Sequence, residues 1–430
     1  MEVFLKPGEK IFTYSTGNQF TVKKMAGEGG MGAVYIAERA KDGRKYALKS
    51  ILPSRVSDEE FLKSFKRECH VWITLGKHPH VVQAHWFDLG EDYTPYLIME
   101  YVEAGTLGDW LDKKGQPSQK NQIDAVRFII EALTGLIYAR DTVRREWGKP
   151  FIHRDIKPAN LLMTGTDKVK VSDFGLAKTR YESQAEWHGT PPYMPPEQWE
   201  GREVEEKTDV YALGCVLYEL CCGRYPFDFP KVYNPRDRAE IEQKIKPVHL
   251  QQIPQKLTDA PLELNHWIQY CLKKDPHARP GFEELREGLQ RVYEKRAGQR
   301  VPVSDDPEPL SAEEWNQRGC GFDRLGEHEQ ALPCFDEAIR LDTSDARFFL
   351  DRGVALMHLK QLDAAIKDFE QALQIDDSLV EAYNNLAAAH AQKGKGEFEK
   401  ALSIYEQAKR LKPGEPRLYV GNGIVYGMMG

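Results

Sequence analysis

The sequence predicts an α+β domain over residues 10–298 followed by an all-α repeat array, and three observations indicate this fold class. Apolar segments with strand character occupy much of the first hundred residues, at Phe20–Ala26, Ala33–Glu38, Tyr46–Lys49 and Tyr96–Val102, with a helical stretch between them at Glu59–Leu75. Polar motifs of a kind that carry chemistry follow between residues 153 and 197. From residue 312 onward, large and small residues return with a period of 34.

A glycine-rich turn joins the first two predicted strands, in the run Ala26-Gly27-Glu28-Gly29-Gly30-Met31-Gly32-Ala33-Val34. Glycine lets the backbone come close enough to a triphosphate for its N–H groups to donate hydrogen bonds. A similar spacing of glycines opens the helix of dinucleotide-binding folds. The segment after this turn has strand rather than helix character, which argues against a dinucleotide-binding fold.

The strongest chemical signal is the run His153-Arg154-Asp155-Ile156-Lys157-Pro158-Ala159-Asn160, with Asp173-Phe174-Gly175 thirteen residues after Asn160. Phosphoryl transfer needs one carboxylate to orient and accept the proton of the attacking hydroxyl. It also needs a second carboxylate to hold Mg²⁺ and a neutral oxygen ligand to complete the coordination of the metal. Asp155, Asp173 and Asn160 suit these three roles in that order.

On these residues the chain resembles the eukaryotic-type Ser/Thr protein kinases, and Gly29-Gly30-Met31-Gly32 looks like the bacterial (Hanks-type-like) members of that family. The resemblance covers about residues 10–298. It implies the bilobal protein-kinase fold, with a small lobe over about 10–100 and a large lobe over about 103–298. It also implies ATP and Mg²⁺, or Mn²⁺ in its place, as cofactors.

The same resemblance assigns residues to the nucleotide. Lys49 would reach the α- and β-phosphates, and Glu68, nineteen residues further on, would hold Lys49 in an ion pair. Glu59 and Glu60 are the rivals, but they fall in the first turn of the helix, where its dipole favours carboxylates anyway. The adenine would contact Val34, Ala47, Leu162, the gatekeeper Met99 and the backbone of Glu100 and Val102.

The segment from Asp173 to Glu197 resembles a kinase activation segment, although Pro195-Pro196-Glu197 stands where Ala-Pro-Glu is usual. By resemblance, Glu197 would pair with a buried Arg279. Lys157 would neutralise the moving phosphoryl group and Thr190 would brace Asp155, which indicates Ser/Thr rather than Tyr substrates.

Regulation would involve Arg154, which in such kinases often holds a phosphate of the activation segment. Thr179, Tyr181 and Ser183 are the candidate acceptors. Glu182 or Glu186 would offer a permanent carboxylate instead, and these alternatives stay open.

Residues 299–311, rich in proline and acidic side chains, read as a short, semi-extended linker. Beyond it, positions marked by large residues and by glycine or alanine recur in three successive copies, 312–345, 346–379 and 380–415, the third with the insertion Lys395-Gly396. Trp315, Gly319 and Phe335, for example, are matched by Phe349, Gly353 and Phe369. This pattern resembles tetratricopeptide repeats, in which large residues of one helix pack where small ones of the other allow close approach. A fourth copy starts at 416 and is cut short at 430, so we expect the native chain to continue.

Charge and composition exclude some classes of function. Residues 1–311 carry 45 basic and 46 acidic side chains and residues 312–430 carry 14 and 20, so the net charges of −1 and −6 sum to −7. No basic stripe that would follow a nucleic acid backbone is present.

The seven cysteines are scattered without a Cys-x-x-Cys pair, which suggests neither a disulfide framework nor a zinc site. No signal peptide or membrane span is expected, which points to the cytoplasm.

The sequence therefore predicts an ATP-dependent Ser/Thr protein kinase whose repeats recruit a partner or substrate or regulate activity. The ligand of the repeat groove would be a protein or peptide, basic by electrostatic complementarity. A nucleotide-binding pseudokinase that serves as a scaffold through its repeats is the alternative, and a small-molecule kinase on the same fold is a third interpretation. Intact catalytic positions argue against the alternative, and the complete segment up to Glu197 together with Arg279 argues against the third.

Overall fold

The computed structural model describes residues 4–13, 17–29, 32–51, 55–114, 119–148, 150–174, 190–230 and 237–429. The chain forms two compact units. One combines Met1–Pro53, His85–Met99 and Pro309–Gly430, and the other combines Ser54–Ala84 and Glu100–Glu308.

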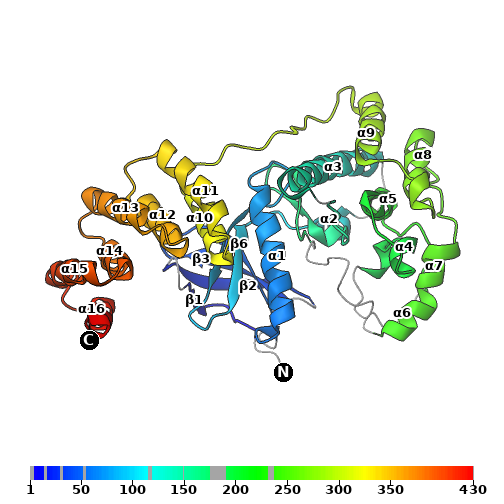
Figure 1. Ribbon diagram of the computed structural model, residues 1–430. Coiled ribbons are helices and arrows are strands. Elements are labelled where there is room, and N and C mark those ends of the chain that lie inside the picture. The colour runs from blue at the N-terminus through cyan, green and yellow to red at the C-terminus, as the bar shows by residue number, and fades with distance from the viewer. Residues whose placement is uncertain are drawn as a thin grey trace. The chain divides into compact units, whose positions relative to one another are not determined.

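A six-stranded sheet dominates the amino-terminal part of the first unit (Figure 1). Its strands lie in the order β1-β2-β3-β4-β6-β5, and the pairs β1–β2, β2–β3 and β3–β4 are antiparallel. The bounds are β1 Lys10–Phe12, β2 Gln19–Gly29, β3 Gly32–Arg39, β4 Lys45–Ile51, β5 Ala84–Leu89 and β6 Pro95–Glu100. The strands predicted from the sequence therefore exist, and within the glycine-rich run β2 ends at Gly29 and β3 begins at Gly32.

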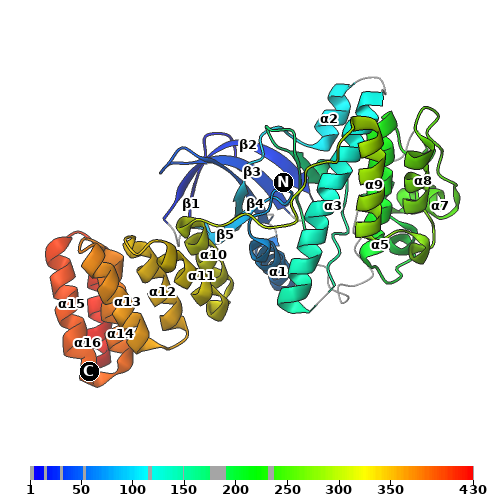
Figure 2. The same cartoon turned by 90° about the horizontal axis from the view of Figure 1, so that it is seen from above.

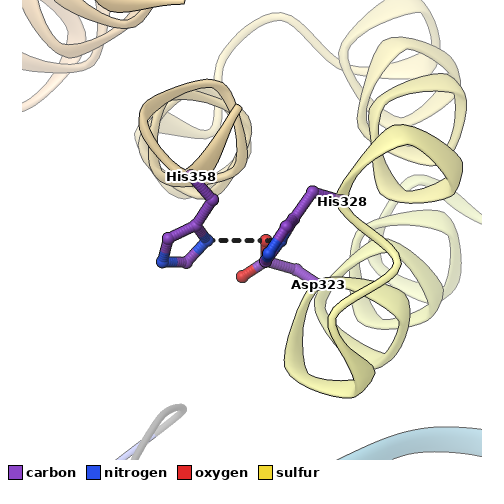
Figure 3. A group of neighbouring side chains, drawn as sticks. All are labelled: Asp323, His328 and His358. Atoms are coloured by element: carbon purple, nitrogen blue, oxygen red, sulfur yellow. Dashed lines mark hydrogen bonds and ion pairs between the residues drawn. The ribbon is translucent and has the colours of Figure 1, made fainter. Parts of the chain in front are cut away.

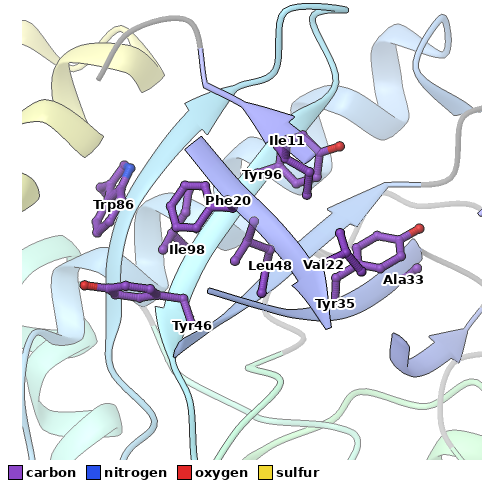
Figure 4. Packing of buried hydrophobic residues seen from close by; sticks show 11 residues of the cluster. Ile11, Phe20, Val22, Ala33, Tyr35, Tyr46, Leu48, Trp86, Tyr96 and Ile98 are labelled. Atoms are coloured by element: carbon purple, nitrogen blue, oxygen red, sulfur yellow. The ribbon is translucent and has the colours of Figure 1, made fainter. Parts of the chain in front are cut away.

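The core of this lobe is a cluster of aromatic and branched side chains on one face of the sheet (Figure 4). Phe20, Tyr46 and Trp86 contact one another, with ring centroids 5.7 to 6.5 Å apart. Because side chains alternate along a strand, the residues between these core positions point to the opposite face. That opposite face carries the residues predicted to bind nucleotide.

Gly32 begins β3 at a point where the neighbouring strand is very close. A Cβ atom on this residue would lie 1.8 Å from the backbone oxygen of Ser50 in β4. Gly27, at the start of the same turn, would meet no atom within 4 Å. Gly32 is therefore required by strand packing, a reason that differs from the approach to phosphate expected from the sequence.

The second unit is mainly helical (Figure 1). Its helices are α1 Glu59–Leu75, α2 Leu107–Lys114, α3 Gln119–Trp147, α4 Pro196–Trp199, α5 Glu206–Cys222, α6 Arg238–Lys244, α7 Lys246–Gln251, α8 Leu262–Cys271 and α9 Phe282–Ala297. Short helices η2 Pro158–Asn160, η3 Pro191–Tyr193 and η4 Pro276–Ala278 and a hairpin of β7 Leu161–Met163 and β8 Val169–Val171 complete it. Helix α5 is apolar on most of its faces and is almost wholly buried, as expected for a helix at the centre of a helical lobe.

The segment 299–308, called the strap below, runs without helix or strand from the end of α9 (Figure 2). Val301 is 3% exposed, and its backbone N–H and C=O both bond the side-chain amide of Gln290 on α9, at 2.9 and 3.1 Å. Further along, the backbone N–H of Glu308 donates to the carbonyl of Lys77, at 2.8 Å. The predicted linker is thus extended, but over these ten residues it is attached to the second unit.

Seven helices form the repeats, and each packs against the next along the chain (Figure 2). They are α10 Ala312–Leu325, α11 His328–Leu341, α12 Ala346–His358, α13 Leu362–Ile375, α14 Val380–Lys393, α15 Phe398–Leu411 and α16 Pro416–Met429. The insertion predicted at Lys395-Gly396 lies in the short helix η5 Lys395–Glu397.

Small residues at fixed positions of the repeats allow aromatic rings to pack on the neighbouring backbone. A Cβ atom on Gly319 would lie 2.6 Å from the ring of Phe335, and one on Gly353 would lie 2.6 Å from the ring of Phe369, 34 residues further on. This is the close approach of helices on which the repeat assignment depended. Within the described residues, no helix is both long and apolar enough to cross a membrane.

Candidate active site

The predicted catalytic carboxylate, Asp155, is held from three sides. Lys157 Nζ lies 2.8 Å from Asp155 Oδ2, and the hydroxyl of Thr190 donates to Asp155 Oδ1 at 3.0 Å. Lys157 Nζ also donates to Thr190 Oγ1 at 2.9 Å, which closes a triangle. Asn160 Nδ2 donates to the carboxylate and to the backbone carbonyl of Asp155, at 3.1 and 2.8 Å. The structure therefore brings together the four residues predicted to be catalytic.

This network fixes the charge of Asp155 as well as its position. Burial alone would raise the pKa of the carboxyl group, but the ammonium group of Lys157 and the hydroxyl of Thr190 hold its pKa below the ordinary value. A carboxylate of low pKa stays ionised at neutral pH, so it accepts hydrogen bonds and orients a hydroxyl group placed beside it.

The backbone under this network is anchored by Asp209, near the start of α5. Its two carboxylate oxygens accept hydrogen bonds from the backbone N–H groups of His153 and Arg154, at 2.7 and 2.8 Å. Arg154 has a φ of 67° and Asp173 a φ of 56°, a left-handed conformation that costs energy for residues other than glycine. The sequence around Asp209 does not predict this role, and its only signal is a position near the head of an apolar helix.

His153 and Phe174 fill the space behind the catalytic loop. The buried imidazole of His153 bonds the carbonyl of Ser172 through Nε2, at 2.8 Å, and burial lowers its pKa. The ring of Phe174 packs against His153 and Phe151, with centroids 5.3 and 5.9 Å apart, and against Trp72 of α1 at 5.5 Å. Through Phe174, the position of Asp173 depends on the packing of α1.

Glu197 and Arg279 form the buried ion pair predicted from the sequence. The guanidinium nitrogens lie 2.6 and 2.9 Å from the two carboxylate oxygens, and the side chains are 1% and 0% exposed. Arg279 also donates to the carbonyls of Lys273, Lys207 and Lys274. This pair fixes the end of the activation segment to the body of the second unit.

The nucleotide residues of the first unit share one face of the sheet. Val34 pairs with Lys49 across β3 and β4, and Ile36 pairs with Ala47, so Val34, Ala47 and Lys49 face the same side. All three are partly exposed, whereas Leu48 between them is buried in the core. Met99 is buried near the end of β6, next to the core residue Ile98. Ala26, Gly27, Glu28, Gly29 and Gly32 lie on the strands that flank the turn.

The remaining nucleotide residues belong to the second unit. Glu68 lies on α1 and is 2% exposed, while Glu59 and Glu60 are exposed in the first turn. Leu162 lies on β7, and Val102 follows β6. The carboxylate of Glu100 binds Lys170 Nζ and the backbone N–H of Gln83, both at 2.7 Å, and the backbone N–H of Glu100 donates to the carbonyl of Gln83 at 2.9 Å. The group of Glu100 predicted to contact an adenine is therefore its backbone carbonyl.

Lys49 and Glu68 lie in different units, and their pairing remains a prediction. Some residues singled out from the sequence fall outside the described residues, and so do the predictions that concern them. They are Gly30, Met31, Gly175, Thr179, Tyr181, Glu182, Ser183 and Glu186.

A divalent cation fits the donor set of Asn160 and Asp173. Both hydrogen-bonding contacts of Asn160 to Asp155 use its Nδ2, which leaves the neutral Oδ1 as an acceptor. Together with the carboxylate of Asp173, it supplies the hard oxygen ligands that Mg²⁺ and Mn²⁺ prefer.

The comparisons with known proteins agree with this geometry. A protein kinase domain model matches residues 20–289, and tetratricopeptide repeat models match residues 316–379 and 382–417. Serine/threonine-protein kinase PksC of Streptomyces coelicolor is 32% identical over 289 residues, covering 64% of this chain and 49% of that protein. Serine/threonine-protein kinase PknB of Mycobacterium tuberculosis is 34% identical over 306 residues, covering 68% and 46%. The chain thus spans about half the length of the curated relatives that it matches.

Proposed function

Because this chain belongs to the protein kinase family and carries tetratricopeptide repeats after its kinase domain, we propose that it transfers the γ-phosphoryl group of ATP to serine or threonine hydroxyls of protein substrates. The observation that carries the proposal is the closed triangle of Asp155, Lys157 and Thr190, with Asn160 bonded to the same carboxylate. The family implies ATP and a divalent metal ion, and Mg²⁺ is the ion we propose.

In the proposed mechanism, Asp155 accepts a hydrogen bond from the substrate hydroxyl and takes its proton as the new O–P bond forms and the bond to the β-phosphate oxygen breaks. Lys157 neutralises charge on the phosphoryl group in transit, and Thr190 keeps the carboxylate in place. Asn160 and Asp173 would hold the metal ion, which supplies charge neutralisation of the phosphates when bound. No acid–base relay beyond Asp155 is required, because the leaving group is a stabilised phosphate anion.

The direct test is incubation of the full chain with ATP labelled in the γ-phosphoryl group and a generic Ser/Thr peptide, followed by mass spectrometry of the modified residues. Asp155→Asn should lower kcat by about 10²- to 10⁴-fold, the usual contribution of a positioned acid–base group. Asp306→Asn changes an exposed aspartate of the strap and serves as the matched control. Residual activity above about a tenth in Asp155→Asn would remove this carboxylate from the proposed role.

A double-mutant cycle tests the proposed ion pair of the nucleotide site. Lys49→Ala and Glu68→Ala should each impair turnover, and the double variant should be little worse than either single one, because the two side chains would act as a unit. Additive losses would contradict the pairing. ATP titration of each variant separates a loss of binding from a loss of turnover.

Asp155, Asn160 and Asp173 are all present in the chain, and the first two lie together in the structure, which argues against the pseudokinase interpretation.

For regulation, we propose that a phosphate on Thr179 or Ser183 of the activation segment binds Arg154. Intact mass before and after ATP, with activity of the Thr179→Ala and Ser183→Ala variants, tests this step. Full activity of the double alanine variant would assign the role to a carboxylate of the segment.

We propose that the repeats bind a protein or peptide, and that their units are residues 312–345, 346–379, 380–415 and the partial copy 416–430. Residues 10–298 would form the catalytic domain, and residues 299–311 would connect it to the repeats. The repeats carry a net charge of −6, which favours a basic ligand. Binding of matched basic and acidic peptides to the full chain, measured at low and high salt, tests the sign of this preference. Tighter binding of the acidic peptide would contradict it.

A further inference from the structure

Three metal-ligating side chains converge between the first and second repeats, in a part of the chain to which no kinase chemistry was assigned (Figure 3). Asp323 lies in the last turn of α10, His328 begins α11 and His358 ends α12. Oδ1 of Asp323 lies 2.7 Å from Nδ1 of His328 and 3.0 Å from Nδ1 of His358. Both imidazoles therefore point at one oxygen of a single carboxylate.

The local backbone explains how residues far apart in sequence meet here. Helix α10 ends at Gly326, whose φ of 90° reverses the chain, so His328 folds back on Asp323 five positions earlier. His358 arrives one repeat later, at the end of the neighbouring helix α12. The two imidazole rings lie 4.4 Å apart, and the carboxylate of Asp323 between them is 6% exposed.

The group is not a requirement of the repeat fold. The second repeat has Met357 and Leu362 at the positions that correspond, 34 residues further on, to Asp323 and His328 of the first repeat. The first repeat has Arg324 at the position that corresponds to His358 of the second. Since the other repeat lacks these side chains and still forms its helices, packing alone does not demand them. The three residues are a local addition at one junction.

We propose that Asp323, His328 and His358 bind a zinc ion between the first and second repeats. Two imidazoles and one carboxylate form a three-ligand set that zinc accepts, with bonds of about 2.0–2.2 Å to nitrogen and oxygen and a fourth tetrahedral position left for another ligand. Ligand atoms around such an ion are about 3.3 Å apart, by the tetrahedral angle and these bond lengths. The separations of 2.7 and 3.0 Å need only a small outward movement of the side chains.

The surroundings offer space for a fourth ligand. His328 and His358 line a cavity of about 330 Å³ whose other walls include Met357, Lys360 and Gln392. One carboxylate leaves a net charge of +1 on a bound zinc ion, and Lys360 adds a positive side chain to the same cavity. Water or an anionic oxygen of a bound protein therefore suits the open position, and the ion would link α10, α11 and α12.

Zinc titration of the full chain tests the proposal. The protein is stripped with a chelator and kept in excess Mg²⁺, so that the oxygen ligands of the kinase site are not counted. The wild-type chain should bind one more equivalent of zinc than His328→Ala or His358→Ala. The affinity at this site should fall by more than about 10- to 100-fold, the loss already typical of changing a group that only hydrogen-bonds a metal ligand.

His277→Ala is the matched control, because this histidine belongs to the second unit and its side chain is 82% exposed. Asp323→Asn removes the charge but keeps the size of the side chain, and circular dichroism of each metal-free variant reports its folding. Loss of the extra equivalent in a folded Asp323→Asn chain, with retention in His277→Ala, supports the site. Unchanged zinc stoichiometry and affinity in Asp323→Asn and His358→Ala would overturn the proposal and leave a hydrogen-bonded trio.

Discussion

Replacing Glu197 by alanine tests how strongly one buried ion pair stabilises the kinase domain. The carboxylate accepts two hydrogen bonds from Arg279 and one from the hydroxyl of Thr208, at 2.6, 2.9 and 2.9 Å. Without it, the guanidinium group keeps its three backbone carbonyl partners but loses its counter-charge in a site with 0% exposure. Removing one partner of a buried pair costs about 3–5 kcal/mol, because an uncompensated charge remains.

That loss is large relative to the free energy of unfolding of a typical domain, about 5–15 kcal/mol. For a domain of this size, about 2–4 °C of midpoint shift accompanies each kcal/mol, so we expect the unfolding temperature of Glu197→Ala to fall by about 6–20 °C. Glu197→Gln keeps the shape and part of the hydrogen bonding, so its unfolding temperature should lie between those of the wild-type chain and Glu197→Ala. Differential scanning calorimetry of the full chain measures the shift.

The matched control is Glu263→Ala, which breaks the exposed ion pair of Glu263 with Lys295. An exposed pair contributes about 0–1 kcal/mol, so this variant should unfold close to the wild-type temperature. Equal shifts for Glu197→Ala and Glu263→Ala would refute the reasoning, because burial of the first pair would then have no energetic effect.

Three further changes follow from features of the structure. Gly32→Ala should lower the unfolding temperature of the first unit, because its Cβ would collide with the backbone of β4, whereas Gly27→Ala enters open space and should leave that temperature nearly unchanged. Lys157→Met should move the acid limb of the pH–rate profile for kcat/KM to higher pH, since the cation that lowers the pKa of the catalytic carboxylate is lost; an unmoved limb would assign that pKa to another group. A chain ending at residue 298 should be less stable to urea than one ending at 308, because burying a valine side chain contributes about 1.5–3 kcal/mol and the strap buries one; equal midpoints would contradict the attachment.

Local motifs were enough to predict which neighbouring residues meet at Asp155. Asp155, Lys157 and Asn160 are close in sequence, so their spacing alone constrains how they meet. Thr190 and Arg279 are distant, and they were found through a resemblance to a family in which such contacts recur. The structure places both where the resemblance implied.

Features that depend on contacts between distant segments were not predictable in this way. Asp209 reads as the polar start of an apolar helix, and nothing in its neighbours says that its carboxylate reaches the backbone of His153. Asp323 and His358 come from different repeats, and neither is a repeated position. The composition of residues 299–311 predicts a semi-extended linker but not its attachment, because a single buried valine and a glutamine on a helix leave no periodic signal.

The attachment of the strap changes the length of chain that separates the repeats from the catalytic domain. Thirteen free residues would reach about 43–47 Å when extended, but with residues 299–308 held, only 309–311 remain, with a reach of about 10–11 Å. On the proposal that the repeats bind a substrate, that substrate would search a small volume rather than a large one. Selection would depend on the distance between its docking sequence and its acceptor serine or threonine, so shifting that distance within one substrate should change the phosphorylated residue.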